Sequence, residues 1–143
     1  MRRLGDYRLW LGHAGDLRDP RAIFAADIRA VVDLAINEPP AALPRELIYC
    51  RFPLLDGAGN PDWLLRLAVD TVAALLRERT PTLVACSAGM SRSLAIAAAA
   101  LAVSQGLSPF EALTHVAGIG PADLSPSLWA EVQGVLGQDQ DKT

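Results

Sequence analysis

A cysteine, a glycine and an arginine lie close together in residues 83–94, which read LVACSAGMSRSL. An apolar, strand-like run ends at Cys86, and a helical pattern begins near Arg92. A Gly-bearing turn between a strand and a helix points successive backbone N–H groups into one concavity. The helix N-terminus adds partial positive charge at the same place. This segment therefore predicts a binding loop for a phosphate group.

Cys86, at the base of such a loop, has the surroundings of a nucleophile. The N–H dipoles and a nearby guanidinium favour the thiolate, which can attack phosphorus. Arg92 can bind two phosphate oxygens at once, and the hydroxyl of Ser93 could donate to the sulfur when it leaves. Most lone cysteines at strand ends are inert core residues. That simpler interpretation does not account for the glycine turn, the arginine and the helix start together.

The pattern Cys-x5-Arg-Ser between a strand and a helix resembles the signature loop of the protein tyrosine phosphatase superfamily. CSAGMSRS is especially similar to the dual-specificity branch, whose loop typically reads His-Cys-x-x-Gly-x-Ser-Arg-Ser. Residues 9–12 (LWLG) and 30–34 (AVVDL) look like the first two strands of that family. The resemblance implies a cysteinyl-phosphate intermediate and phosphate binding by the loop residues Ser87, Ala88, Gly89, Met90, Ser91 and Arg92.

The resemblance also implies a general acid on a mobile loop upstream of the cysteine. Asp56 is the candidate, because it follows the strand-like residues 52–55, where dual-specificity enzymes place their acid. Gly57 and Gly59 would let this loop close over a substrate. Asp62 is the alternative acid, although the helix dipole alone accounts for a carboxylate in the first turn of a predicted helix.

Two features depart from the family pattern, and a third narrows the range of expected substrates. The family usually has His before the nucleophile, and Ala85 stands there in this chain, which predicts a weakened or retuned enzyme. Dual-specificity enzymes often carry an Arg in the region of residues 115–121, and none occurs here. We therefore expect looser support of the loop or a changed substrate preference. No Lys or Arg precedes Arg92 inside the loop, which disfavours polyphosphorylated lipids and RNA triphosphate ends.

Four further residues have both a functional and a structural interpretation. Cys50 lies in the middle of a predicted strand as a core residue, or forms a reversible disulfide with Cys86 under oxidation. Glu38 either shapes the substrate rim or is a solvated loop residue. His13 and His115 have no neighbours at ligand spacing, so we predict no metal site and no cofactor.

Strand-like and helix-like segments alternate through the chain and must position these residues. The patterns predict strands over residues 7–11, 30–35, 46–54 and 81–85, and helices over 20–27, 61–79, 91–105, from 108, and from 125 to near 137. We therefore expect an α/β fold, with a central, mostly parallel twisted sheet of about four to five strands and helices on both faces. Residues 1–143 form one predicted domain, with 138–143 as a disordered tail.

Composition limits the class of protein. A chain of 143 residues with 51% hydrophobic and 20% charged residues fits one globular domain. A net charge of −3 gives no support to a nucleic-acid surface built on positive charge. The longest apolar run, residues 94–103, is shorter than the roughly 20 residues that span a bilayer. No signal peptide is visible and two cysteines make no disulfide framework, so we expect a cytoplasmic protein. We also expect a monomer that binds neither membranes nor nucleic acid.

Together these observations predict a cysteine-dependent phosphomonoesterase of the protein tyrosine or dual-specificity type. Cys86 attacks phosphorus, Arg92 and the loop N–H groups hold the oxygens, Asp56 protonates the leaving group and Ser93 assists the departing thiolate. The predicted substrate is a phosphorylated protein or a small phosphomonoester. The alternative is a phosphatase-like module that binds phospho-residues with little or no turnover, for which Ala85 is the main argument. A thiol redox or arsenate-reducing enzyme is weaker, because it would need nearby resolving cysteines.

Overall fold

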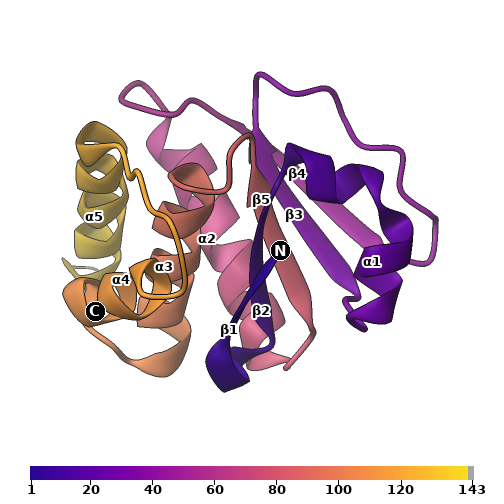
Figure 1. Ribbon diagram of the computed structural model, residues 1–143. Helices are drawn as coiled ribbons and strands as arrows, with labels where there is room; N and C mark the ends of the chain where they lie inside the picture. The colour runs from indigo at the N-terminus through magenta and orange to yellow at the C-terminus, as the bar shows by residue number, and fades with distance from the viewer. Residues whose placement is uncertain (142–143) are drawn as a thin grey trace.

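A mostly parallel sheet forms the centre of the protein (Figure 1). The computed structural model describes residues 1–141, and in these the sheet has five strands in the order β1-β2-β5-β3-β4. The strands are β1 (Arg2–Leu4), β2 (Leu9–His13), β3 (Ala30–Ala35), β4 (Ile48–Leu54) and β5 (Thr82–Cys86). β1 pairs antiparallel with β2, whereas the β2–β5, β5–β3 and β3–β4 pairs are parallel. The predicted α/β sheet is confirmed.

Helices cover both faces of this sheet, as the alternating pattern predicts (Figure 1). One face carries the short helices η2 (Ala14–Arg18) and α1 (Pro20–Ala25). The opposite side carries α2 (Asp62–Arg77), α3 (Arg92–Gln105), α4 (Pro109–Ala117) and α5 (Pro126–Asp141). A further short helix, η1 (Gly5–Tyr7), joins β1 to β2. None of the described helices has the length and apolar character needed to cross a membrane.

Local capping signals explain where several helices begin and end. The Asp19 side chain accepts a hydrogen bond from the amide of Ala22 at the start of α1, and the Ser108 hydroxyl accepts one from Glu111 in α4. α3 ends at Gly106, which adopts the left-handed conformation with φ of +69°. These signals are contiguous in the chain, so the helix starts could be predicted from the sequence.

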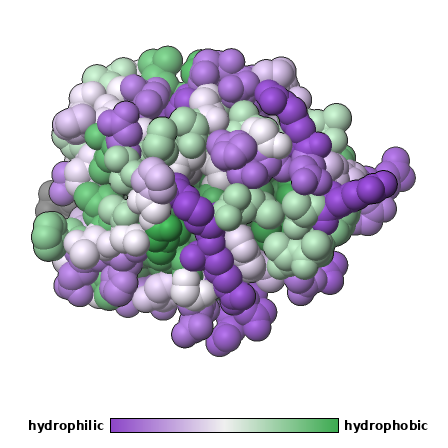
Figure 2. All heavy atoms as spheres, viewed as in Figure 1, coloured by the Kyte–Doolittle hydropathy of each residue, from purple (hydrophilic) through white to green (hydrophobic). Residues whose placement is uncertain are grey.

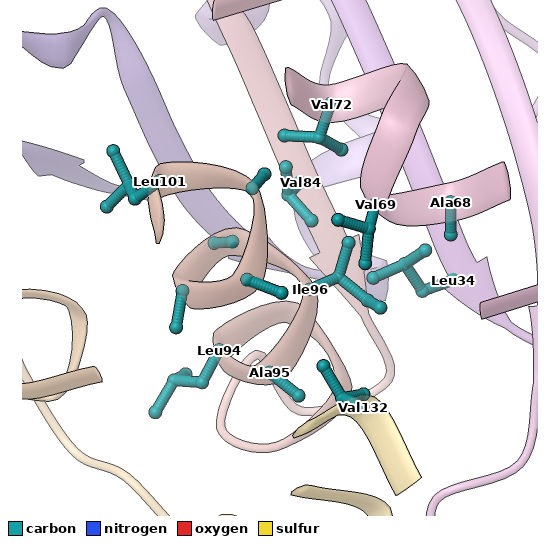
Figure 3. Close-up of a cluster of buried hydrophobic side chains, with 14 of the residues drawn as sticks. Leu34, Ala68, Val69, Val72, Val84, Leu94, Ala95, Ile96, Leu101 and Val132 are labelled. Carbon is teal, nitrogen blue, oxygen red and sulfur yellow. The ribbon is translucent and has the colours of Figure 1, made fainter. Parts of the chain in front are cut away.

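α3 lies at the centre of the larger hydrophobic core (Figure 3). Ile96 of this helix lies among Val69 and Val72 of α2 and Val84 of β5, and Leu94 points from another side of α3 into the same core. The alanines over residues 97–100 are fully buried, and their small side chains let α3 approach both the sheet and its neighbouring helices closely. This packing fixes the start of α3, and with it the end of the loop that follows β5.

The structure differs from the predicted elements at both ends of the chain. β1 was not predicted, because three residues reading RRL carry no alternating apolar pattern. A hydrophilic band crosses the surface where β1 lies (Figure 2), as is common for an edge strand that must avoid further pairing. α5 continues to Asp141, past its predicted end near Gly137. The rest of the predicted tail, residues 142–143, lies outside the described residues.

Candidate active site

The loop over residues 87–91, called the phosphate loop below after its predicted ligand, joins the carboxyl end of β5 to the first turn of α3. β5 lies between β2 and β3, so Cys86 at its end is flanked by the carboxyl ends of two parallel neighbours. That edge is where open α/β sheets bind ligands. A recess of about 90 Å³ opens there, lined by Asp56, Cys86, Ser87, Ala88, Met90, Ser91, Arg92 and Asp123. The fold thus gathers the predicted nucleophile, arginine and acid around one small recess.

Cys86 and Ser93 form a buried pair below this recess. The Cys86 side chain is 3% exposed, and its Sγ lies 3.3 Å from the Ser93 Oγ, with the thiol donating to the hydroxyl. When the sulfur is ionised, the same geometry lets the Ser93 hydroxyl donate to it instead. The structure therefore places the Ser93 hydroxyl within hydrogen-bond distance of the Cys86 sulfur.

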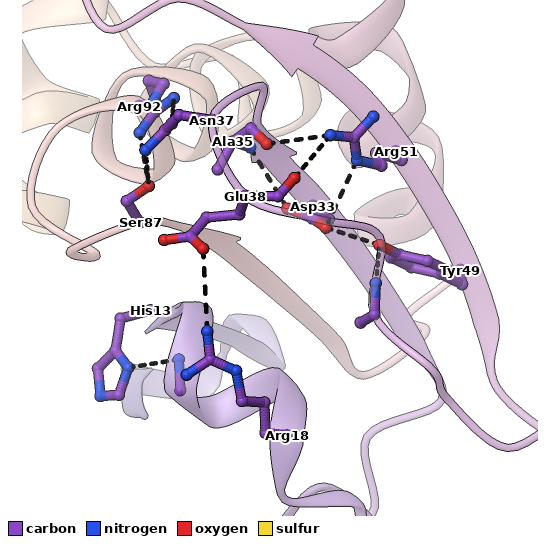
Figure 4. A network of polar contacts seen from close by, with 12 residues as sticks. His13, Arg18, Asp33, Ala35, Asn37, Glu38, Tyr49, Arg51, Ser87 and Arg92 are labelled. Carbon is purple, nitrogen blue, oxygen red and sulfur yellow. Dashed lines mark hydrogen bonds and ion pairs between the residues drawn. The ribbon is translucent and has the colours of Figure 1, made fainter.

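Arg92 is held in place by neutral acceptors from three segments, of which Figure 4 shows Asn37 and Ser87. Its Nη1 donates to Asn37 Oδ1 at 2.8 Å and to the Leu54 carbonyl at 3.0 Å, and its Nη2 donates to Ser87 Oγ at 3.1 Å. The side chain is 5% exposed, yet its Nε has no hydrogen-bond acceptor among the described residues. Buried donors are nearly always paired. An anion in the adjoining recess would supply the missing acceptor.

Asp56 is fixed beside the phosphate loop by a chain of hydrogen bonds. The Ser91 hydroxyl donates to Asp56 Oδ1 at 2.5 Å, and the Ser125 amide donates to Ser91 Oγ at 3.0 Å. Asp62 begins α2 and does not belong to the described lining of the recess. Of the two acids that the sequence offers, the structure brings Asp56 to Cys86 and Arg92.

The loop that carries Asp56 is braced from inside and from outside. The buried Asn60 side chain accepts from the Leu55 amide at 2.8 Å and donates to the Leu55 and Gly57 carbonyls at 3.0 and 3.2 Å. Glu131 of α5 accepts from the amides of Gly59 and Asn60. The two glycines led us to expect a loop that closes over substrate, whereas these contacts hold it in a defined shape.

Three carbonyl groups of the phosphate loop receive donors from outside it. The Ser87 carbonyl accepts from the Ala14 amide at 3.2 Å, and the Met90 carbonyl accepts from the Asp123 amide at 2.9 Å. The Gly89 carbonyl accepts from Arg2 Nη2 at 2.6 Å. Each donor comes from a different segment, so three separate parts of the chain hold the loop through its carbonyl groups.

Two features require glycine at position 89: its backbone conformation and the close approach of β2. Its φ is +74°, and a Cβ built there would lie 2.8 Å from the Gly12 carbonyl oxygen. β2 therefore approaches the back of the phosphate loop too closely for any side chain at this position. Gly89 lies outside the described lining of the recess, unlike the other five predicted phosphate-binding residues.

Several residues of this site were not predicted from the sequence. Asn37 orients Arg92 and also donates from Nδ2 to Ser87 Oγ at 2.8 Å. Its only signal in the sequence is that it follows a predicted strand. Asp123 adds a second carboxylate to the lining of the recess. Arg2 also donates to the Pro121 carbonyl at 2.9 Å, and nothing in its sequence neighbourhood indicates this role.

Ala85 lies on the opposite side of β5 from Cys86 and is fully buried. It belongs to a smaller hydrophobic cluster together with Ile23 of α1, and it pairs with Gly12 and Asp33 on the flanking strands. The position is therefore part of the packing between the sheet and α1. The donors described above support the phosphate loop beside this alanine.

A polar network shapes the loop that carries Asn37 (Figure 4). The Tyr49 hydroxyl donates to the buried Asp33 Oδ2 at 2.6 Å and accepts from the Ala41 amide at 2.9 Å. Burial raises the pKa of Tyr49, and the hydrogen bond to Asp33 raises that pKa further. Arg51 Nη2 donates to the Glu38 carbonyl at 2.9 Å. The network ties the loop to β3 and β4.

Cys50 is too far from Cys86 for a direct disulfide. Cys50 pairs with Val32 of β3, and Val32 pairs on its other side with Val84, two residues before Cys86. Two strand spacings of ~4.8 Å already exceed the Cα separation of ~7 Å that a disulfide allows. The fold therefore argues against the redox alternative. Within the described part of the chain, no group of three or more His, Cys, Asp or Glu residues could hold a metal ion.

Comparisons with known proteins agree with this geometry. No protein-family model matches the chain, and no curated protein sequence matches it. Among solved structures, human DUSP28 is similar with a TM-score of 0.87 and 25% identity over 100% of both chains. A mouse putative dual specificity phosphatase complexed with zinc tungstate has a TM-score of 0.86 and 25% identity, covering 99% of this chain and 89% of its own.

A third neighbour shows the fold at lower identity. The human tyrosine phosphatase-like serine/threonine/tyrosine-interacting protein has a TM-score of 0.80 and 16% identity over 98% of this chain and 97% of its own. The fold and the loop after β5 define the phosphatase-fold class of α/β domains. Within that class, structural neighbours that are dual-specificity phosphatases support the protein tyrosine phosphatase superfamily for this chain. These neighbours support a phosphatase-type function.

Proposed function

We propose that this protein is a cysteine-dependent phosphomonoesterase of the dual-specificity type. The observation that carries the proposal is the buried Arg92, which lines the same recess as Cys86 and whose Nε has no acceptor among the residues that the structure describes. A phosphoryl group there would accept from the guanidinium while its phosphorus faces the nucleophile. The tungstate complex of the mouse relative is in keeping with this, because tungstate is a tetrahedral oxyanion like phosphate.

The reaction proceeds in two steps. The Cys86 thiolate attacks phosphorus, the bond from phosphorus to the leaving oxygen breaks, and protonated Asp56 gives its proton to that oxygen. The resulting Asp56 carboxylate then takes a proton from water, which attacks the cysteinyl phosphate. The sulfur–phosphorus bond breaks, the Ser93 hydroxyl donates to the departing thiolate, and inorganic phosphate is released. Every group in this scheme belongs to the protein or to water, so no cofactor is required.

The first experiment is hydrolysis of p-nitrophenyl phosphate against pH by the wild type and by Cys86→Ser. We expect turnover in the wild type and its loss in the variant. Asp56→Asn and Asp62→Asn form a matched pair for the acid, and Asp56→Asn is expected to reduce kcat by roughly 10²- to 10⁴-fold, the usual contribution of a general acid. Wild-type turnover no greater than that of Cys86→Ser would refute the enzymatic proposal.

The second candidate function is phospho-residue binding with little or no turnover, favoured by alanine in place of the usual histidine at position 85. A binding module has little use for Asp56 fixed beside Cys86, so we rank it below the enzyme. Phosphotyrosine peptide binding by a protein without turnover, abolished in Arg92→Ala, would establish this function instead.

We further propose that residues 1–143 are one catalytic domain that acts as a cytoplasmic monomer on phosphorylated proteins or small phosphomonoesters. Sedimentation at assay concentrations tests the monomer. A dimer, and activity that falls on dilution below its dissociation constant, would contradict the proposal.

A further inference from the structure

A second recess, of about 300 Å³, lies next to the phosphate loop. One wall is formed by η2 and the other by the loop that follows β3, with Asp33 also in the lining. The two recesses adjoin at two points. The Ala14 amide in η2 donates to the Ser87 carbonyl, and Asn37, the residue before Glu38, contacts both Ser87 and Arg92. A substrate whose phosphoryl group lies over Cys86 would therefore extend toward this second recess.

The walls of the second recess combine apolar surface with one carboxylate that is available to a ligand. Leu17, Pro39 and Pro40 supply apolar surface. Glu38 stands between the Arg92 region and Arg18, as Figure 4 shows, and its Oε2 lies 3.8 Å from Arg18 Nη2. The Arg18 side chain is 71% exposed, and solvent weakens ion pairs in which one partner is this exposed. A cation on a ligand can therefore replace Arg18 as the partner of Glu38.

The other carboxylate in the lining already has its partners. Asp33 is 2% exposed and accepts hydrogen bonds from Tyr49 and from the Ala35 amide. Arg51 Nε lies 4.0 Å from it on the side of β4. The negative charge of Asp33 is thus already compensated by groups of the protein. Glu38 is the carboxylate through which the recess would recognise a positive charge.

We propose that this second recess binds a basic side chain, arginine or lysine, next to the phosphorylated residue of a peptide substrate. The methylene stem would lie along Leu17 and the two prolines, and the charged head would reach Glu38. This inference rests on the proposed function, whose catalytic recess of about 90 Å³ holds little more than the phosphoryl group. Recognition of the surrounding peptide therefore depends on neighbouring surfaces such as this one.

The test compares phosphotyrosine peptides that differ at one position, carrying Arg, Ala or Glu directly before or directly after the phosphorylated residue. The readout is the ratio of kcat/KM for the Arg peptide to that for the Ala peptide, which cancels general effects on catalysis. For the preferred position we expect a ratio of about 5 in the wild type, corresponding to an ion pair near 1 kcal/mol. Glu38→Gln should bring this ratio to about 1.

Two further variants make the test specific. Arg18→Ala removes the internal competitor for Glu38, so it should raise the ratio above that of the wild type. Glu46→Gln makes the same chemical change at an exposed residue outside the lining, and it should keep the wild-type ratio. A wild-type ratio near 1 at both positions, or an equal ratio in Glu38→Gln, overturns the inference.

Failure of the proposed function is distinguishable from failure of this inference. If p-nitrophenyl phosphate is turned over but the peptides show no preference for Arg, the subsite is refuted and the enzyme stands. If no substrate is turned over, the dissociation constants of the same peptides are compared by fluorescence anisotropy. A fivefold advantage of the Arg peptide that is lost in Glu38→Gln then supports the subsite in a binding protein, and equal constants refute it.

Discussion

At the scale of single residues, the environment of Arg92 suits a dianionic ligand. The acceptors that orient its guanidinium are an amide oxygen, a backbone carbonyl and a hydroxyl, from Asn37, Leu54 and Ser87. All three are neutral, so they fix the direction of the side chain without cancelling its charge. A carboxylate in place of Asn37 would hold the same geometry but would compete with the phosphoryl group for the positive charge.

The Asn37 interaction gives the first prediction. Asn37→Asp should raise the KM for p-nitrophenyl phosphate more than Asn37→Ala does, because the new carboxylate neutralises Arg92. Loss of one hydrogen bond to a charged group, ~1.5–3 kcal/mol, predicts about a tenfold or greater fall in kcat/KM for Asn37→Ala. Steady-state kinetics at constant ionic strength measures both. Equal KM values for the two variants would contradict the electrostatic argument.

At the scale of elements, β1 supports the phosphate loop through one side chain. Arg2 donates to Gly89 in that loop and to Pro121 in the segment between α4 and α5. The chain has no arginine in residues 115–121, where the family resemblance leads one to expect it, and Arg2 brings a guanidinium to this segment from the other end of the chain. Arg3 instead places its guanidinium 5.0 Å from the ring centre of Trp10.

This arrangement gives the second prediction, with a control in the same strand. Arg2→Ala should lower kcat/KM by roughly tenfold, because two charge-assisted hydrogen bonds to the loops around the site are lost. Arg2→Lys should restore part of the activity, and Arg3→Ala should change kcat/KM little. Thermal melting of all three variants separates loop positioning from general destabilisation. Equal losses of activity in Arg2→Ala and Arg3→Ala would show that β1 acts only through the stability of the fold.

The braced acid loop gives the third prediction. Asn60→Ala removes three hydrogen bonds from the loop that carries Asp56. We expect kcat to fall about tenfold for phenyl phosphate, whose leaving group needs protonation, with a smaller fall for p-nitrophenyl phosphate. The KM values should stay similar, since Arg92 and the phosphate loop bind the phosphoryl group. A uniform fall in kcat for both substrates would contradict a role in positioning the acid.

At the scale of the whole molecule, the parallel sheet brings distant segments to one edge. The ends of β2, β3 and β5 lie side by side, so η2, the Asn37 loop and the phosphate loop meet there. The Tyr49–Asp33 hydrogen bond then ties β4 to β3 behind the Asn37 loop. Any change that loosens this bond therefore affects both the sheet and the rim of the site.

The raised pKa of Tyr49 gives the fourth prediction, on stability against pH. The folded state holds the Tyr49 proton more tightly than the unfolded chain, in which the tyrosine pKa is about 10. The contribution of Tyr49 to stability is therefore fully present below pH ~10 and is lost as the pH rises through the folded-state pKa. Urea unfolding at pH 8 and above pH 10 measures the loss.

Tyr49→Phe is the control for this effect. It should be less stable than the wild type at pH 8, by ~1–3 kcal/mol, because Asp33 loses a buried donor. It should also lose less stability than the wild type between pH 8 and the alkaline range. Identical pH dependence of the two proteins would show that Tyr49 does not titrate as described.

The parts of the fold and site that could be predicted are those whose signals lie in residues adjacent in the sequence. Cys86, Arg92 and Ser93 lie within eight residues, and their spacing alone specifies a strand, a turn and a helix start. Apolar patterns and caps placed β3, β5, α2 and α3, because burial and capping act over a few neighbouring residues. β1 and the long end of α5 escaped prediction, since pairing with β2 and continuation of a polar helix leave no such local pattern.

The sequence by itself determined which groups stand together at the centre: a cysteine, a glycine-bearing turn and an arginine at fixed separation, the set from which the chemistry is proposed. Only the tertiary structure decided what surrounds that centre. It placed Asp56 in the described lining of the recess, separated Cys50 from Cys86, and brought Arg2 and Asn37 to the phosphate loop. The physical reason is that local turns depend on adjacent residues, whereas these contacts depend on the strand order, which aligns segments far apart in the chain.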